Sequence, residues 1–124
     1  MYHFHAGVIS RSSGGSACAH AAYISASRIH DDRTGDTWDY TKKKREVLHT
    51  TILTPEGSPE WIYDGETLWN AVESFEDFIA EKRFRGHKDP VKNAKSTAAR
   101  NKYQNSCLTQ FKADIALPLE IKDP

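Results

Sequence analysis

The chain of 124 residues carries 17 basic and 17 acidic side chains, so its formal net charge is zero, and 38% of its residues are hydrophobic. This composition predicts a single globular domain with a modest core. Its two cysteines lack metal-binding spacing, and neither a signal peptide nor an apolar run of membrane-spanning length is present. These features argue against a secreted, disulfide-rich or membrane-inserted protein and predict a cytoplasmic one with reduced thiols.

The periodicity of the sequence predicts an α+β fold, in which helices pack on a mostly antiparallel sheet. Strands are expected at 2–9, 37–41, 46–54 and 108–117, the middle two pairing across a basic turn. Helices are expected at 16–28, from Asp64 onward, and at 91–105, with turns at 31–36 and 55–59. In the second helix one apolar stripe is expected to face the core, made of Leu68, Val72, Phe75 and Ile79.

The segment 10–23 places one tyrosine on a helix of small residues. Its turn of serines and glycines, followed by alanines, favours a helix that begins near Ser16. Tyr23 then lies about two turns along, where small neighbours leave its hydroxyl open to a large substrate. The helix start, together with Arg11, Ser12 and Ser16, forms a predicted phosphate-binding patch. The alternative is a half-buried tyrosine used for packing.

Basic side chains are concentrated in two parts of this neutral chain. Four of them are consecutive, Lys42, Lys43, Lys44 and Arg45, and eight more fall between residues 82 and 102 against one acid. Acidic residues are concentrated instead between 56 and 81. Segregated positive charge is typical of surfaces that bind a nucleic-acid backbone. The alternative is an ordinary solvated face.

The chain resembles the MobA/MobL family of plasmid mobilisation relaxases in ordered segments that begin at the first strand. These segments read YHF (2–4), VISRS (8–12), GSA (15–17), AAY (21–23), HDDRTG (30–35), DYTKK (39–43), LTP (53–55), SPEW (58–61), LWNAVE (68–73) and IALPLE (115–120). The resemblance implies that Tyr23 is the nucleophile that nicks one DNA strand at a transfer origin during conjugation and stays joined to the 5′ phosphate. Single-stranded DNA and accessory mobilisation proteins are the partners it implies.

The resemblance also implies a divalent metal, Mg²⁺ or Mn²⁺. A free tyrosine has a pKa of about 10, so a metal held by histidines would help by polarising the phosphate under attack. A carboxylate could take the proton or orient a histidine, and Asp114 and Glu120 are the candidates for that supporting role. The alternatives for these two are an edge-strand charge and a loop charge.

The family draws metal ligands from a His-hydrophobe-His strand downstream of the Ala-Leu-Pro segment, and the sequence stops at Pro124, shortly after that segment. The resemblance therefore implies that residues 1–124 form a single, incomplete relaxase-like domain, like the first half of a relaxase domain. His3 and His5 show the same pattern on the expected first strand, where they share one face. They are candidate metal ligands, and the alternative is a strand with one histidine that faces the site and one incidental histidine. His20, one turn before Tyr23, could bond to the phenolate or be a surface histidine.

Two functions follow from these observations. The first is a DNA strand transferase or nickase, of which this chain is the N-terminal part and carries the tyrosine nucleophile. We expect this part of the endonuclease to be inactive alone. The second is a non-catalytic remnant or accessory DNA-binding module of a mobilisation system. A complete set of metal-binding histidines is the feature that would separate them.

Overall fold

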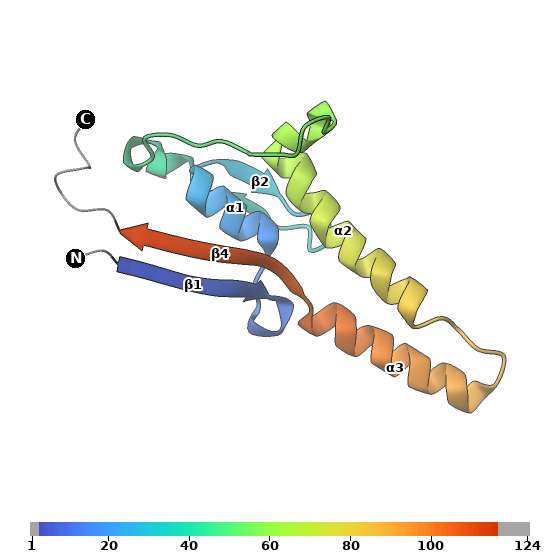
Figure 1. Cartoon of the computed structure of the whole chain (residues 1–124). Coiled ribbons are helices and arrows are strands. Elements are labelled where there is room, and N and C mark those ends of the chain that lie inside the picture. Colours follow the sequence, from blue (N-terminus) through green and yellow to red (C-terminus); the bar gives the residue numbers. More distant parts are fainter. Residues whose placement is uncertain (1–2, 117–124) are drawn as a thin grey trace.

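The computed structural model describes residues 3–116 and contains three α-helices and four strands in that range (Figure 1). The elements in chain order are β1 (His3–Ser10), α1 (Ala17–Ser25), β2 (Arg28–His30), β3 (Thr37–Asp39), α2 (Gly65–Arg83), α3 (Pro90–Ser106) and β4 (Leu108–Ala116). Three 3₁₀ helices lie at Arg11–Ser13, Thr41–Glu46 and Glu60–Tyr63. Both strand pairs are antiparallel, which confirms the predicted α+β class.

The first and last elements of this range pair with each other. β1 and β4 form a two-stranded ladder in which His5 lies opposite Asp114 and Val8 lies opposite Phe111. β2 and β3 form a separate hairpin, with Ile29 opposite Trp38. Figure 1 shows α2 and α3 as two long helices that run side by side away from the strands.

α1 forms and ends for local reasons. The Ser16 side chain accepts a hydrogen bond from the Ala19 N–H and caps the helix start, and alanines favour the turns that follow. The helix ends at Ser25 because Ala26 adopts a left-handed backbone conformation with φ of 50°. The predicted continuation to residue 28 is therefore wrong, and Arg28 opens β2 instead.

The core lies between α1, α2 and the hairpin. Its buried members are three small side chains of α1, Cys18, Ala21 and Ala22, together with Ile29 of β2. The rings of Trp38, Tyr40 and Trp69 pack against them. Small side chains allow α1 to approach α2 closely. The face that α2 turns inward contains Glu73 and Ala80, both at most 2% exposed. Phe75 belongs to the predicted apolar stripe but is 58% exposed, so the prediction that it faces the core is wrong.

The largest difference from the predicted fold concerns residues 41–54. Residues 41–46 form a 3₁₀ helix, and no strand is assigned between 47 and 54. The expected partner strand, β3, pairs with β2 instead, and Leu48 and Leu53 are each 90% exposed. The strand propensity of residues 46–54 does not produce a strand, because no neighbouring strand pairs with this segment. The predicted turn at 31–36 is confirmed as the β2–β3 connection, with Gly35 at φ of 79°.

Candidate functional site

Tyr23 lies on the last turns of α1 and is 50% exposed. The ammonium nitrogen of Lys43 lies 3.2 Å from the centroid of the Tyr23 ring. The same nitrogen is 3.5 Å from the carbonyl oxygen of Tyr23 and donates a hydrogen bond to it. The edge of the Tyr40 ring completes the surroundings, with ring centroids 5.3 Å apart and planes at 86°. An accessible phenol and a cation therefore share one surface.

Backbone hydrogen bonds bring the basic residues to this tyrosine. The Tyr40 N–H donates to the Ser27 carbonyl at 3.0 Å and so fixes the chain after β3 to the end of α1. The 3₁₀ helix Thr41–Glu46, called the basic helix below, begins at that point. Its side chains Lys42, Lys44 and Arg45 are exposed. The sequence predicted the tyrosine and the basic segment separately, and the structure places them together.

Arg11 does not form part of this surface. It is 7% exposed, and its guanidinium donates five hydrogen bonds. Nε and Nη2 both bond to the Glu73 carboxylate, Nη2 also bonds to the Glu73 carbonyl, and Nη1 bonds to Asp77 and to the Gln104 carbonyl. Burial lowers the pKa of Arg11, but the hydrogen bonds to Asp77 and Glu73 outweigh it and raise that pKa. Because all five N–H donors are used, the structure gives Arg11 a structural role in place of the predicted phosphate contact.

The start of α1 is also occupied by the protein itself. The second carboxylate oxygen of Glu73 accepts the Ala17 N–H at 3.0 Å, where the sequence predicted a phosphate. Ser16 donates to the buried Asp31 carboxylate at 2.8 Å. Ser12 is exposed, and its hydroxyl lies 2.7 Å from that of Ser10. A carboxylate at a helix start is stabilising for the same electrostatic reason as a phosphate.

The structural role of Glu73 was not predicted from the sequence. Its sequence signals were its place in the segment LWNAVE (68–73) and its helical spacing, four residues after Trp69 and seven before Ala80. An acid at such a position needs a buried cation, and Arg11 is that cation. The two side chains are 2.6 Å apart and at most 3% exposed.

The candidate metal ligands lie on the β1–β4 ladder. His5 and Asp114 are opposite each other and both exposed, and His3 lies opposite Ala116. The His20 ring nitrogen Nδ1 bonds to the Gln110 side chain, which ties α1 to β4. Within residues 3–116 no group of three or more His, Cys, Asp and Glu is placed to hold a metal ion. Glu120 lies outside the described range.

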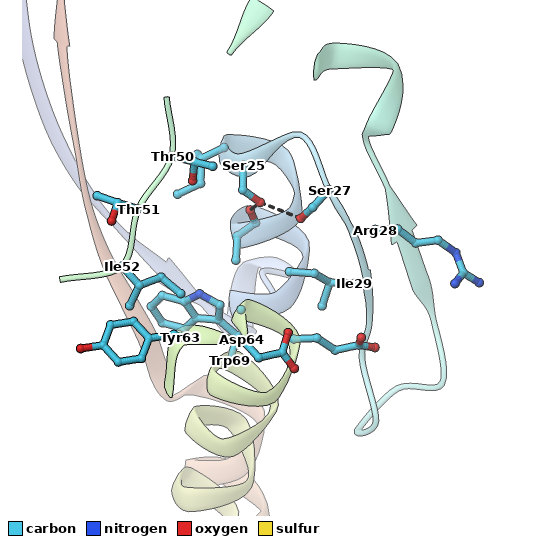
Figure 2. Close-up of a pocket in the computed structure, with 14 residues that line it drawn as sticks. Ser25, Ser27, Arg28, Ile29, Thr50, Thr51, Ile52, Tyr63, Asp64 and Trp69 are labelled. Atoms are coloured by element: carbon cyan, nitrogen blue, oxygen red, sulfur yellow. Dashed lines mark hydrogen bonds between the residues drawn. The ribbon is translucent and has the colours of Figure 1, made fainter. Parts of the chain in front are cut away.

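A pocket of about 550 Å³ lies beside the end of α1 (Figure 2). Ile52, Tyr63 and Trp69 contribute much of its wall, and the Ser25 and Ser27 hydroxyls, 2.6 Å apart, lie at its far side. Asp64 and Glu66 are also in its lining, and Figure 2 shows the Arg28 side chain pointing away from it. The lining thus includes two carboxylates as well as Arg28, and its charge does not indicate a phosphate site.

The family of the chain is established by comparison with known sequences. The profile of the MobA/MobL family matches residues 15–85, more than half of the chain. The chain belongs to the MobA/MobL family, as the resemblance predicted.

Individual relatives agree with that assignment. The chain is 45% identical over 76 residues to the probable mobilization protein MobA of Bifidobacterium longum, covering 61% of this chain and 13% of that protein. It is 43% identical over 74 residues to the mobilization protein MobL of Acidithiobacillus ferridurans, covering 60% and 18%. It is 34% identical over 84 residues to the conjugal transfer protein TraA of Rhizobium radiobacter, covering 60% and 8%. The matched part is thus a small fraction of each relative.

One solved structure is similar over 98% of this chain and 48% of its own chain, with a TM-score of 0.70 and 28% identity. It is described as "Molecular Basis of Vancomycin Resistance Transfer in Staphylococcus aureus". The similar fold therefore extends beyond the segment that the family profile matches. In the part of the chain that is described, every helix is too short or too polar to cross a membrane.

Proposed function

We propose that this chain is the part of a plasmid mobilisation relaxase that carries the tyrosine nucleophile. The family membership and the printed names of the relatives, which are mobilization and conjugal transfer proteins, support this role. The observation that carries the proposal is the half-exposed Tyr23 in direct contact with a cation of the basic helix. A nucleophile for a DNA phosphate needs both an open hydroxyl and positive charge beside it.

In the proposed reaction the Tyr23 oxygen attacks a phosphorus atom of single-stranded DNA at a transfer origin. A bond forms between the phenol oxygen and phosphorus, and the bond from phosphorus to the 3′ oxygen breaks. The 3′ oxygen takes up a proton from water and leaves as a 3′ hydroxyl, while the 5′ phosphate stays joined to Tyr23. The phenol proton leaves to a base, for which Asp114 and Glu120 remain the candidates. Lys42, Lys44 and Arg45 neutralise phosphates on either side of the attacked one. Accessory mobilisation proteins would deliver the DNA.

A divalent ion, Mg²⁺ or Mn²⁺, belongs to this proposal because the resemblance to the family implies it. His3 and His5 on β1 are the candidate ligands, and two ligands are too few for a structural or catalytic centre. We expect the 124-residue chain alone to be inactive and a chimera that adds the following segment of a longer relative to be active.

A denaturing gel with a labelled single-stranded origin oligonucleotide tests the proposal. The chain and the chimera are incubated with DNA and Mn²⁺, and a covalent adduct appears as a band of lower mobility. Tyr23→Phe should abolish the adduct and leave DNA binding nearly intact, because only the attacking hydroxyl is lost. Tyr40→Phe is the matched control, since it removes a neighbouring phenol hydroxyl, and it should keep the adduct. An adduct that persists in Tyr23→Phe would contradict the proposal.

The second candidate is a DNA-binding module without nicking activity, which the incomplete metal set in residues 3–116 favours. It predicts salt-dependent binding to single-stranded DNA and no adduct from either the chain or the chimera. An adduct from the chimera that depends on Tyr23 would exclude it.

A further inference from the structure

Lys43 differs from the other cations of the basic helix. Lys42, Lys44 and Arg45 are exposed, whereas Lys43 is half-buried against the end of α1. Its ammonium lies 3.2 Å from the Tyr23 ring centroid, well inside the range of about 6 Å over which a cation is attracted to an aromatic face. Its charge therefore acts within the protein as well as on the surface.

One further contact of the ammonium and one backbone hydrogen bond hold Lys43 at the end of α1. It donates to the Tyr23 carbonyl at 3.5 Å, one of the last carbonyls of the helix, where a positive charge is favourable. The backbone of the basic helix is fixed on the same side, because the Lys43 N–H donates to the Tyr40 carbonyl at 2.9 Å. The position of Lys43 is thus set by backbone bonds at Ser27 and Tyr40.

The Tyr23 ring is consequently held on two sides. The ammonium lies over it, and the edge of Tyr40 meets it at 86°, while half of the residue stays exposed. An exposed tyrosine without such contacts would change rotamer freely. A nucleophile gains rate when its attacking atom is held in the geometry of attack.

We propose that Lys43 is a positioning residue, which holds the ring of Tyr23 in one orientation while Lys42, Lys44 and Arg45 bind the DNA backbone. This inference rests on the proposed role of Tyr23 as the nucleophile. It divides the basic helix into one side chain that acts on the protein and three that act on the DNA. Substitution of Lys43 should therefore affect the Tyr23 ring, whereas substitution of its neighbour Lys44 should affect DNA binding.

Nuclear magnetic resonance of the 124-residue chain with labelled tyrosine rings tests the contact without requiring activity. The Tyr23 signals are identified by their loss in Tyr23→Phe. Lys43→Met keeps a long stem and removes the charge, and it should move the Tyr23 signals toward those of an unrestrained tyrosine. Lys43→Arg should restore them, because a guanidinium also stacks on aromatic rings. Lys44→Met is the matched control and should leave them in place. Unchanged Tyr23 signals in Lys43→Met would overturn the proposal.

Kinetics of adduct formation, in whichever of the chain and the chimera forms the adduct, test the consequence. Lys43→Met should lower the rate at saturating DNA by about ten- to a hundredfold with little change in DNA affinity. Lys44→Met should instead weaken DNA binding and reduce its salt dependence. Loss of the adduct in Tyr23→Phe together with a wild-type rate in Lys43→Met would refute positioning and leave the proposed function standing. An adduct that survives Tyr23→Phe would refute the proposed function, and the ring signals would still decide the contact.

Discussion

Removal of the Glu73 carboxylate should destabilise the fold more than any exposed substitution, because Glu73 neutralises a buried cation. In Glu73→Ala the guanidinium of Arg11, 7% exposed, loses both hydrogen bonds to that carboxylate, and the Ala17 N–H loses its acceptor. Asp77 still accepts one bond at 2.8 Å, but its side chain is 34% exposed and compensates the buried charge only in part. Breaking a buried ion pair by removing one partner costs about 3–5 kcal/mol.

That loss is a large fraction of the 5–15 kcal/mol that stabilises a typical domain. Urea denaturation followed by circular dichroism measures it, with Glu73→Gln as a milder variant that keeps the side-chain volume. Asp77→Ala is the matched control on the same arginine and should cost about 1–2 kcal/mol, since its hydrogen bond is partly exposed. A loss below about 1 kcal/mol in Glu73→Ala, or equal losses in the two alanine variants, would refute the assignment of Glu73 as the principal partner of Arg11.

Three further predictions concern binding, ionisation and capping. Affinity for single-stranded DNA should fall steeply between about 50 and 200 mM salt. Alanines at Lys42, Lys44 and Arg45 should lower the slope of log K against log salt by about 2. A titration that does not depend on salt would contradict this prediction. Burial raises the pKa of the Cys18 thiol from 9.0 to about 12, so the unfolded chain loses this proton first as the pH rises. Stability should therefore decline between pH 9 and 12, less steeply in Cys18→Ala, and an identical decline in both proteins would refute the effect. Ser16→Ala should lower stability by at least about 1 kcal/mol, measured by thermal unfolding against Ser12→Ala, because it removes both the α1 cap and the hydrogen bond to the buried Asp31 carboxylate, neither of which Ser12 provides.

Local patterns in the sequence predicted much of the fold. The serine before a run of alanines indicated the start of α1, and the helix expected at 91–105 is present as α3 (Pro90–Ser106). The strand expected at 46–54 failed because its propensity depended on a partner, and the structure pairs β3 with the short segment Arg28–His30 instead. The local periodicity of a sequence does not indicate which distant segments pair as strands.

The residues of the candidate site were predicted from the sequence, but their arrangement in space was not. Tyr23 and the basic segment were both identified, but their contact depends on the backbone bond between Tyr40 and Ser27, which no spacing indicates. Arg11 was assigned to the surface because it precedes a helix start, and the deciding partner, Glu73, lies 62 residues later. Such a partner becomes visible only when α2 is packed against α1.

The most direct test of the central claim is mass spectrometry of the covalent adduct. Trypsin should release residues 12–28 as one peptide, in which Tyr23 is the single tyrosine. The chimera is incubated with an origin oligonucleotide and Mn²⁺, and the digest is treated with nuclease so that a short 5′-phosphorylated remnant marks the attachment point. The account predicts that remnant on peptide 12–28 and its disappearance in Tyr23→Phe. A remnant on any other peptide, or none on DNA-bound chimera, would contradict the assignment of Tyr23 as the nucleophile.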